Sequence, residues 1–551
     1  MLLELARDRS LCRAVASYGF YRLAEYGPWL AILVYAYGHG GATATGLVSF
    51  GILIPTGLFA PLAGPLIDRF GASKVLLGAY AVQALVMAAT SVALLAGSPP
   101  ALVYVLAALT AMALTVAHPA YAVVSPGLAH TTEQLVALNA VTGWVLSIGL
   151  VLGPALAGAI LAFSTPGVVY LAGALALTIS TLLVLPLHGL VPPLSTKAAE
   201  GVASTLRGLA QGGRALVQAS ASWEVVIVIA AAFATVGALD VLLVRLAIGP
   251  LGMGGSGAGY LSAAHGGGAV AGAAVSLALV GRPHLVPVLI GAGVFGGAAL
   301  AVLGLVTTVV VAFLAAAATG LSRSLLEVTG QTLMQRVTST ELLAGAFAFK
   351  EGLAMSAWGI GAATVPAVLA LTGTTGALIF TGAIVPAVML VRLRRLLAVD
   401  AAVTVPAVTI ALLRSLVVFR ALPVPALEGV AKESTEQAVS AGTVVIREGD
   451  RGDSYYVVAD GVLEVTHDGR KVNELSRGDG CGEIALLHDA VRTATVTAVT
   501  DARLVAVERE PFLIAVTGHG ETLSRFQDVA QQRLDSDGEK RVSEPPAQTP
   551  S

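Results

Sequence analysis

Residues 478–496 read Gly-Asp-Gly-Cys-Gly-Glu-Ile-Ala-Leu-Leu-His-Asp-Ala-Val-Arg-Thr-Ala-Thr-Val. The glycines predict a tight turn that leads into a short helix near Glu483. The first backbone N–H groups of a helix have no partner inside it and point outward, so they can bind an anion. Arg492 follows within reach of the same point, and its planar guanidinium suits a phosphate. The stretch therefore predicts a site for a ligand that offers a phosphate to Arg492 and a hydroxyl to Glu483.

This stretch resembles the phosphate-binding cassette of the cyclic nucleotide-binding domain family. The resemblance implies that Glu483 holds the ribose 2′-hydroxyl and that Arg492 pairs with the cyclic phosphate. It also implies that three residues supply a cradle of backbone N–H groups, namely Gly482, Ile484 and Ala485. The ligand expected here is a regulatory cyclic nucleotide.

Thr493 bears on which nucleotide is bound. In the family a hydroxyl at this position can bond a guanine in its syn form, although related domains with the same threonine prefer cAMP. We therefore expect cAMP, with cGMP as the alternative. Cys481 stands where the family usually has an aromatic residue and Val491 where it has a proline, but both changes leave the polar groups intact. A jelly roll that has lost its ligand is the competing interpretation.

The rest of the chain has the composition of a membrane protein. Hydrophobic residues make up 56% of the 551 residues and charged residues only 12%, whereas about a quarter of the residues of a soluble domain are charged. A helix needs about 20 apolar residues to cross a bilayer core of about 30 Å. This length divides residues 14–391 into twelve predicted spans in two sets of six, at 14–37, 43–67, 75–96, 101–124, 136–163, 167–188, 223–247, 257–280, 285–306, 308–332, 345–371 and 375–391.

Beyond residue 396 the composition changes to that of a small soluble domain. Short alternating apolar runs, separated by glycines, are typical there of an antiparallel jelly roll. We therefore predict an all-α polytopic membrane domain followed by a β jelly-roll cyclic nucleotide-binding domain with flanking helices. The predicted boundaries are 1–190 for the N-terminal six-helix half, 191–222 for a cytoplasmic central loop, 223–396 for the C-terminal half, 397–412 for a linker, 413–534 for the nucleotide-binding domain and 535–551 for a disordered tail.

Basic residues predict the orientation of the spans, because Lys and Arg accumulate in cytoplasmic loops. If the N-terminus is cytoplasmic, nearly all basic loop residues fall on that side, and the opposite loops near 38–42, 97–100, 164–166 and 373–374 contain none. We therefore expect a multi-pass protein of the plasma membrane, in contact with the lipid bilayer, with both termini cytoplasmic. The net charge of −2 gives no electrostatic support for binding nucleic acid.

The loop after the second predicted span reads Gly64-Pro-Leu-Ile-Asp68-Arg69-Phe-Gly71. Its glycines permit a tight turn between two helices, and Asp68 can meet a helix end or a basic group when this side of the protein closes. The stretch resembles the signature loop of the major facilitator superfamily. The resemblance implies a conformational latch, formed by these two glycines with Asp68 and Arg69, that holds the two halves in the outward-open state. The alternative is an ordinary basic loop that only fixes the topology.

An internal repeat also indicates two halves. Thr132-Glu-Gln-Leu before the fifth span is echoed by Thr340-Glu-Leu-Leu before the eleventh, and Gly153 by Gly361, all at an offset of 208 residues. Matching halves that rock about a central site are typical of secondary transporters. Gly153 and Gly158 also resemble part of the superfamily's antiporter motif, although close packing of small residues explains them equally well.

Charged side chains inside membrane helices are costly and therefore mark functional candidates. Arg22 and Glu25 lie in the first span, Asp240 in the seventh, and Arg323 and Glu327 in the tenth. Helices at these positions line the central cavity in the superfamily, and a carboxylate among them could carry a proton. Structural pairing of Arg22 with Glu25, or of Arg323 with Glu327, is the alternative.

Together these features predict a secondary active transporter, a proton-coupled exporter of a small molecule, that is regulated by cyclic nucleotide bound to its cytosolic domain. The alternative is a membrane receptor or sensor that transports nothing and whose state the nucleotide sets. The sequence offers no nucleophile and base constellation, no metal-ligand spacing and no ATP-binding loop. We therefore predict neither an enzyme nor a metal site, and no cofactor.

Overall fold

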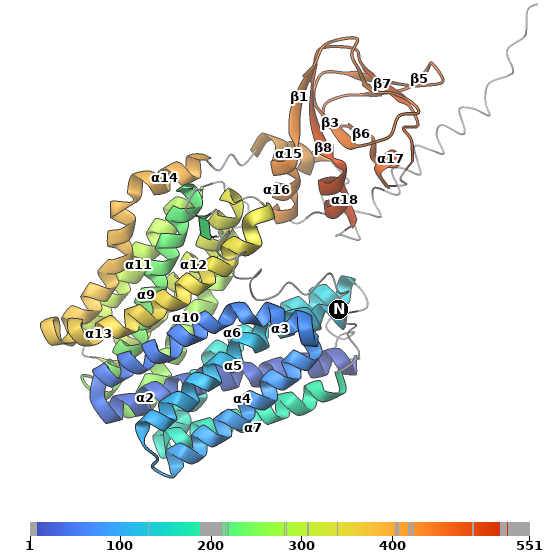
Figure 1. The fold of residues 1–551 in the computed structure, drawn as a ribbon. Coiled ribbons are helices and arrows are strands. Elements are labelled where there is room, and N and C mark those ends of the chain that lie inside the picture. The colour runs from blue at the N-terminus through green and yellow to red at the C-terminus, as the bar shows by residue number, and fades with distance from the viewer. Residues whose placement is uncertain are drawn as a thin grey trace, which may run out of the picture. The chain divides into compact units, whose positions relative to one another are not determined.

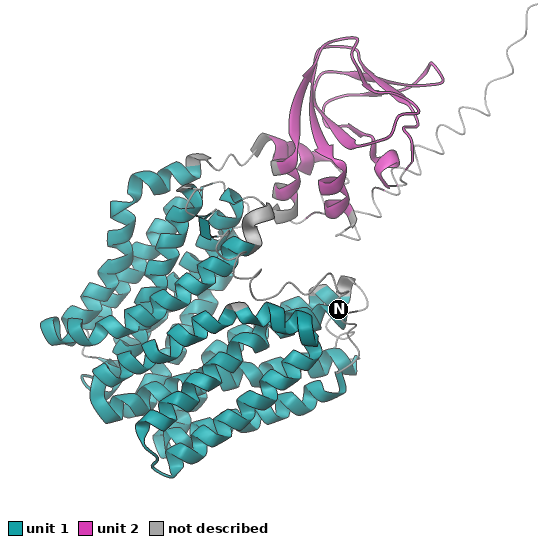
Figure 2. Ribbon diagram, viewed as in Figure 1, with its two compact units in different colours: residues 1–279, 284–403 teal, residues 280–283, 404–551 magenta. Residues whose placement is uncertain are grey.

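The fold is that of a computed structural model. The structure describes residues 8–129, 132–187, 213–214, 216, 220–279, 282, 284–305, 308–338, 340–402, 407–416, 419, 422, 424–487, 490–517 and 526. The predicted tail and most of the predicted central loop lie outside these residues. The chain divides into two compact units, residues 1–279 with 284–403 and residues 280–283 with 404–551 (Figure 2).

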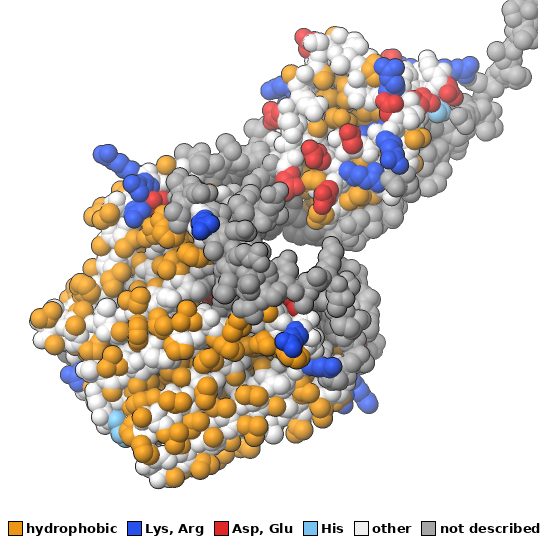
Figure 3. All heavy atoms as spheres, viewed as in Figure 1, with side chains coloured by type: hydrophobic (Ala, Val, Ile, Leu, Met, Phe, Trp, Pro, Cys, Tyr) orange, Lys and Arg blue, Asp and Glu red, His pale blue; other side chains and the backbone are white. Residues whose placement is uncertain are grey.

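The first unit is built from long apolar helices (Figure 1). They are α2 (Arg9–Phe59), α3 (Ala63–Phe70), α4 (Ala72–Leu95), α5 (Pro100–Gly127), α6 (Thr132–Phe163), α7 (Pro166–Val184), α9 (Ser220–Ile248), α10 (Gly254–Ser276), α11 (Val286–Leu305), α12 (Val309–Val337), α13 (Thr340–Val391) and α14 (Leu393–Ala402), with 3₁₀ turns at η1 (Ala60–Leu62), η2 (Leu185–Leu187) and η3 (Leu277–Leu279). Within the described residues, ten helices are long and apolar enough to cross a membrane. Large apolar side chains cover the visible face of this unit (Figure 3), and those of Leu58, Phe163 and Leu371 are among the most exposed. An exposed apolar surface of this extent suits contact with lipid tails.

Two of these helices, α2 and α13, are each broken along their length. Gly40 and Gly41 in α2 and Gly373 in α13 have non-helical backbone angles. The breaks fall at the predicted loops after the first and eleventh spans, and the stretch on either side of each break is long enough to cross a bilayer. The count of twelve spans stays a prediction, with which these breaks agree.

The two halves repeat one packing arrangement. Helices α6 and α13 begin 208 residues apart. A Cβ atom added to Gly153 of α6 would lie 2.8 Å from the Cβ of Tyr26 in α2, and one added to Gly361 of α13 would overlap the carbonyl oxygen of Ala234 in α9. Tyr26 and Ala234 are again 208 residues apart. Each glycine therefore lets its helix approach the first helix of its own half.

The stretch predicted as the signature loop is helical. Helix α3 contains Gly64, Asp68 and Arg69, and Gly71 joins it to α4 with a φ of 84°, a backbone angle that favours glycine. The expectation of a loop was wrong here because Pro65 falls in the first turn of α3, where a proline is tolerated, so the helix can continue to residue 70. Asp68 and Arg69 are both exposed.

Two acidic side chains hold α14 against other helices of the first unit. The buried carboxylate of Glu224 in α9 accepts hydrogen bonds from Arg392 at 2.9 and 3.1 Å and from Arg395 at 3.3 Å. Asp400 in α14 accepts hydrogen bonds from the backbone N–H groups of residues 285 and 286, at 3.1 and 3.3 Å, where α11 begins. Because Asp400 satisfies free donors at a helix start, it caps α11.

The second unit is a jelly roll of two four-stranded antiparallel sheets with short helices (Figure 1). One sheet has the order β1-β8-β3-β6 and the other β2-β7-β4-β5. Its elements are α15 (Ala407–Ser415), α16 (Val424–Glu433), β1 (Thr435–Val439), β2 (Val444–Ile446), β3 (Ser454–Asp460), β4 (Leu463–His467), β5 (Arg470–Leu475), β6 (Gly480–Cys481), α17 (Glu483–Leu487), β7 (Thr495–Ala498), β8 (Ala502–Glu508) and α18 (Arg509–Thr517). An aromatic cluster of Phe419, Tyr455, Phe512 and Phe526 packs the helices onto the first sheet.

Candidate functional site

A cavity of about 220 Å³ lies in the second unit. All six residues predicted from the cassette line it: Gly482, Glu483, Ile484, Ala485, Arg492 and Thr493. The rest of the wall comes from strands β2, β4, β5, β6 and β7 and from the residue before β7. It is mainly apolar, and apart from Cys481 the sequence did not single it out: Ile446, Val465, Val472, Asn473, Leu475, Cys481, Ala494 and Val496. Alternation of apolar residues along the predicted strands was the one signal for these positions.

Arg492 is buried, and backbone oxygens fix its guanidinium. Its Nη1 donates to the carbonyl of Gly482 at 2.9 Å and its Nη2 to that of Ser454 at 2.6 Å. The carboxylate of Asp453, itself largely exposed, lies 3.9 Å from Nη2. A guanidinium has five N–H donors in a fixed plane. Two carbonyls therefore orient the group while leaving it donors for a ligand.

Two glycines make the space that Arg492 fills. Gly482 has a φ of 98°, and a Cβ atom there would overlap Nη1 of Arg492. A Cβ atom at Gly452 would lie 3.0 Å from Cζ of Arg492 and 2.7 Å from the Cβ of Ala485. Gly452 is thus a site residue that the sequence alone presented only as a turn glycine.

Glu483 is the first residue of α17 and its side chain is buried, with 2% of its surface exposed. The cavity is therefore lined by a buried carboxylate and a buried guanidinium, groups that leave water only when partners or a ligand compensate them. On the neighbouring strand, burial raises the pKa of the Tyr456 phenol, and the carboxylate of Asp453 raises this pKa further. That phenol therefore stays neutral at physiological pH.

In the first unit, Asp240 joins tryptophans of two distant helices. Its Oδ2 accepts hydrogen bonds from the indole N–H of Trp29 in α2 at 3.1 Å and from that of Trp358 in α13 at 3.0 Å. The guanidinium carbon of Arg323 lies 5.9 Å from the ring centroids of both Trp358 and Phe233. Two of the transport candidates, Asp240 and Arg323, therefore meet at Trp358.

The remaining candidates differ in their pairing. Arg22 and Glu25 form an ion pair within α2, and Arg22 also donates to the hydroxyl of Tyr26 at 2.8 Å. In the described part of the chain, Arg323 and Glu327 make no ion pair; Glu327 instead accepts a 3.4 Å hydrogen bond from the amide of Gln331. Structural pairing thus applies to the first pair and not to the second.

Two family models match this chain. Residues 14–366, more than half of the chain, match the model of the Major Facilitator Superfamily. The chain belongs to the major facilitator superfamily. Residues 436–517 match the model of the Cyclic nucleotide-binding domain. This superfamily member is therefore a multi-pass membrane protein fused to a cyclic nucleotide-binding domain.

Curated relatives match short stretches of this chain. A cAMP-dependent protein kinase regulatory subunit of Schizosaccharomyces pombe is 37% identical over 111 residues, which is 20% of this chain and 27% of that protein. The cGMP-dependent protein kinase egl-4 of Caenorhabditis elegans is 40% identical over 110 residues, which is 18% of this chain and 14% of that protein. The superfamily member thus spans about a quarter or less of these relatives' length.

Among solved structures, a POT family transporter in complex with a thioalcohol conjugated peptide has a TM-score of 0.56 with this chain. The match covers 71% of this chain and 96% of that chain at 14% sequence identity. At this identity the likeness establishes the fold of the membrane helices alone.

Proposed function

We propose that this chain is a secondary active transporter whose state is set by a cyclic nucleotide bound in its second unit. The observation that carries the proposal is one cavity lined by both a buried guanidinium and a buried carboxylate, Arg492 and Glu483, in a domain of the cyclic nucleotide-binding family. A cyclic nucleotide offers a phosphate and a ribose hydroxyl, which these two groups can bind together. The cavity's apolar wall suits the flat base.

We propose cAMP as the ligand of the cavity, with cGMP as the alternative. Arg492 would donate its remaining N–H groups to the cyclic phosphate, and Glu483 would accept the ribose 2′-hydroxyl. The backbone N–H groups of Gly482, Ile484 and Ala485 would complete the phosphate cradle. Relatives named for cAMP and for cGMP both match this region, so they support the ligand class and leave the choice between the two open.

Polar contacts in the membrane unit support a transport cycle in which the unit opens in turn to either side of the membrane. The guanidinium of Arg245 in α9 donates to the hydroxyl of Tyr37 in α2 at 2.9 Å, near the predicted outer ends of both helices. On the predicted cytoplasmic side, Asp68 is exposed and makes no ion pair with the described residues. This arrangement suits a state closed outside with the proposed latch of Gly64, Asp68, Arg69 and Gly71 released.

Proton-coupled export of a small molecule is the transport activity that we propose. Asp240 is the proposed proton carrier, because its single carboxylate joins α2 of one half to α9 and α13 of the other through two indoles. Arg22, Glu25, Arg323 and Glu327 are proposed to line the path of the substrate. The proposed location is the plasma membrane, with both termini cytoplasmic.

Titration calorimetry of the full chain in detergent with cAMP and cGMP tests the nucleotide site. We expect saturable binding that Arg492→Leu abolishes and that Arg503→Leu leaves unchanged, because Arg503 pairs with Asp460 on the exposed surface, 67% and 64% exposed. Failure of the wild-type chain to bind either nucleotide would refute the regulatory part of the proposal. Transport is tested in proteoliposomes holding a pH-sensitive dye. A panel of small apolar compounds is added in turn. At least one compound should cause proton movement across the membrane in vesicles that hold the wild-type chain, and none in vesicles that hold Asp240→Asn. If the chain is a receptor, no compound causes proton movement.

A further inference from the structure

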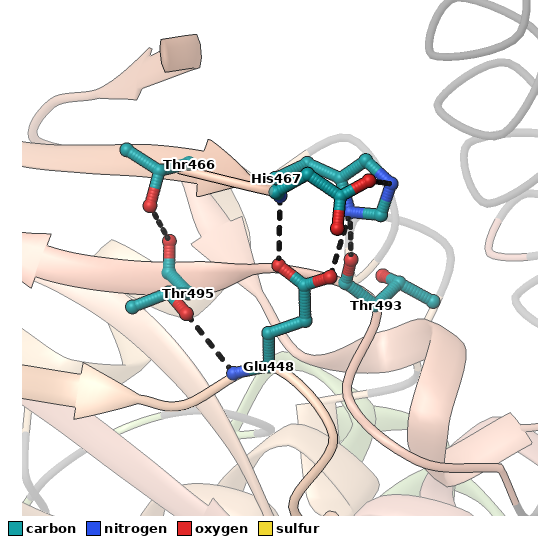
Figure 4. A network of polar contacts seen from close by, with 6 residues as sticks. Glu448, Thr466, His467, Thr493 and Thr495 are labelled. Carbon is teal, nitrogen blue, oxygen red and sulfur yellow. Dashed lines mark hydrogen bonds and ion pairs between the residues drawn. The ribbon is translucent and has the colours of Figure 1, made fainter. Parts of the chain in front are cut away.

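The tip of the β4–β5 hairpin carries a polar network that includes Thr493 (Figure 4), a residue of the cavity wall. His467 ends β4, and Asp468 follows it with a φ of 48° in the turn. The imidazole Nδ1 lies 2.7 Å from the carbonyl oxygen of Thr493 and 3.2 Å from a carboxylate oxygen of Glu448. The other ring nitrogen lies 3.7 Å from the carboxylate of Asp468. One imidazole thus connects the hairpin to a residue of the cavity wall.

These contacts place a proton on Nδ1 of His467. A carbonyl oxygen can only accept, so Nδ1 must donate to Thr493. Glu448 holds the network from the other side, since its second carboxylate oxygen accepts the backbone N–H of Asp468 at 3.1 Å. Ligand atoms of Glu448, His467 and Asp468 also lie within 4.8 Å of one another. With Nδ1 donating to Thr493, only Nε2 is left as a metal ligand, and the hydrogen bond to the Thr493 carbonyl needs no ion.

The segment that His467 holds lies just before a paired strand. The paired register of β4 and β7 begins with Thr466 opposite Thr495, two residues after Thr493. The backbone of Arg492 is held from another direction, by hydrogen bonds of 2.8 and 2.9 Å to the loop that follows β2. His467 therefore contacts the backbone at Thr493, the first of the two residues between Arg492 and the start of the ladder.

Thr493 matters because polar groups are few in the cavity wall. Apart from Glu483 and Arg492, which suit the sugar and the phosphate, the polar side chains of the wall are those of Asn473 and Thr493. cAMP and cGMP differ only in the polar edge of the base, so a wall hydroxyl is a group that can tell them apart. Its position depends on where the backbone of Thr493 is held.

We propose that His467 is a positioning residue that sets nucleotide selectivity by fixing the backbone of Thr493, with Glu448 orienting the imidazole. This rests on the proposed binding of cyclic nucleotide. Loss of the His467 donor lets Thr493 shift and changes the ratio of the cAMP and cGMP affinities. Arg492 keeps its phosphate geometry, because Gly482 and Ser454 hold it independently of the hairpin.

The test compares two substitutions of His467 in the full chain in detergent, by titration with cAMP and with cGMP. His467→Leu removes the donor, whereas the side-chain amide of His467→Asn places an N–H donor near the position of Nδ1. We expect the ratio of the two Kd values to change threefold or more in His467→Leu and to stay within twofold of wild type in His467→Asn. Lys471→Ala, in the same hairpin but paired with the carboxylates of Glu464 and Glu474, is the control and should leave the ratio unchanged.

The outcomes separate this inference from the function on which it rests. The inference alone would be overturned if the wild-type chain binds nucleotide and His467→Leu has the same ratio of the cAMP and cGMP Kd values. So would equal losses of both affinities that His467→Asn does not rescue, because that result marks a merely structural histidine. No nucleotide binding by the wild-type chain would overturn both proposals.

Discussion

Replacing Gly482 by alanine should weaken nucleotide binding. The loss of affinity should be far larger than the strain that the alanine puts on the folded backbone explains. The backbone at this residue has a φ of 98°, which L side chains rarely adopt, so alanine costs about 1–3 kcal/mol in strain. The added methyl group would also overlap Nη1 of Arg492. The guanidinium must then leave the position in which the carbonyls of Gly482 and Ser454 hold it.

The displacement of the guanidinium sets the expected loss of affinity. A hydrogen bond to a charged group contributes about 1.5–3 kcal/mol. Each 1.4 kcal/mol changes a dissociation constant about tenfold. Losing one such bond between Arg492 and the phosphate therefore raises the Kd for the nucleotide about 10- to 150-fold.

Gly442 offers a matched control for this substitution. It has a φ of 85°, and a Cβ atom added there meets no atom within 4 Å. Gly442→Ala should thus carry a similar backbone strain and a similar drop in melting temperature, with an unchanged Kd. Both variants are measured as the full chain in detergent, by calorimetric titration and by thermal melting. Equal Kd values for Gly482→Ala and Gly442→Ala would refute the claim that the missing side chain at residue 482 positions Arg492.

Three further predictions concern the membrane unit, and thermal melting in detergent checks each of them. Glu224→Ala should lower the melting temperature, because it removes the hydrogen bonds that join Arg392 and Arg395 to α9; a wild-type melting temperature would contradict the anchoring of α14. Asp240→Leu should be less stable than Asp240→Asn, since leucine leaves two indole N–H groups without an acceptor, at about 1–3 kcal/mol each, and the reverse order would count against the two bonds described. Gly361→Ala should destabilise the unit because its Cβ would overlap the carbonyl of Ala234, whereas Gly352→Ala in the same helix meets no atom within 4 Å and should be neutral or stabilising; similar melting of the two variants would exclude close helix contact at residue 361.

The sequence predicted best those features whose signal is local. The break at Gly40 and Gly41 falls between two predicted spans because a membrane helix has a fixed apolar length, which can be counted along the chain. The cassette from Gly482 to Arg492 was recognisable because its turn, carboxylate and arginine lie within eleven residues. Its binding role stays a prediction, although the structure brings these residues to one cavity.

Features that depend on distant partners could not be read from one sequence. Asp240 was an evident candidate, but its bond to Trp29 joins residues 211 positions apart, and no local pattern indicates that pairing. Gly452 lies 40 residues before Arg492, whose guanidinium it accommodates. Nothing in the sequence singled out His467, because its contact with the carbonyl of Thr493 exists only in the fold.

One covalent route from the nucleotide site to the membrane unit runs along the chain through α14, which precedes residues 404–551 of the second unit. This helix is held near both ends, by Glu224 of α9 through Arg392 and Arg395 and by Asp400 at the start of α11. Its ten residues span roughly 15 Å, and α9 also carries Asp240. If α14 tilts, it therefore either moves α9, which holds Asp240, or breaks the ion pairs of the buried Glu224. Nucleotide binding can bias the transporter only by the difference between its affinities in the two states, and a tenfold difference supplies about 1.4 kcal/mol. Because breaking the Glu224 pair would cost more than that, α14 should move together with α9 and α11 as one body.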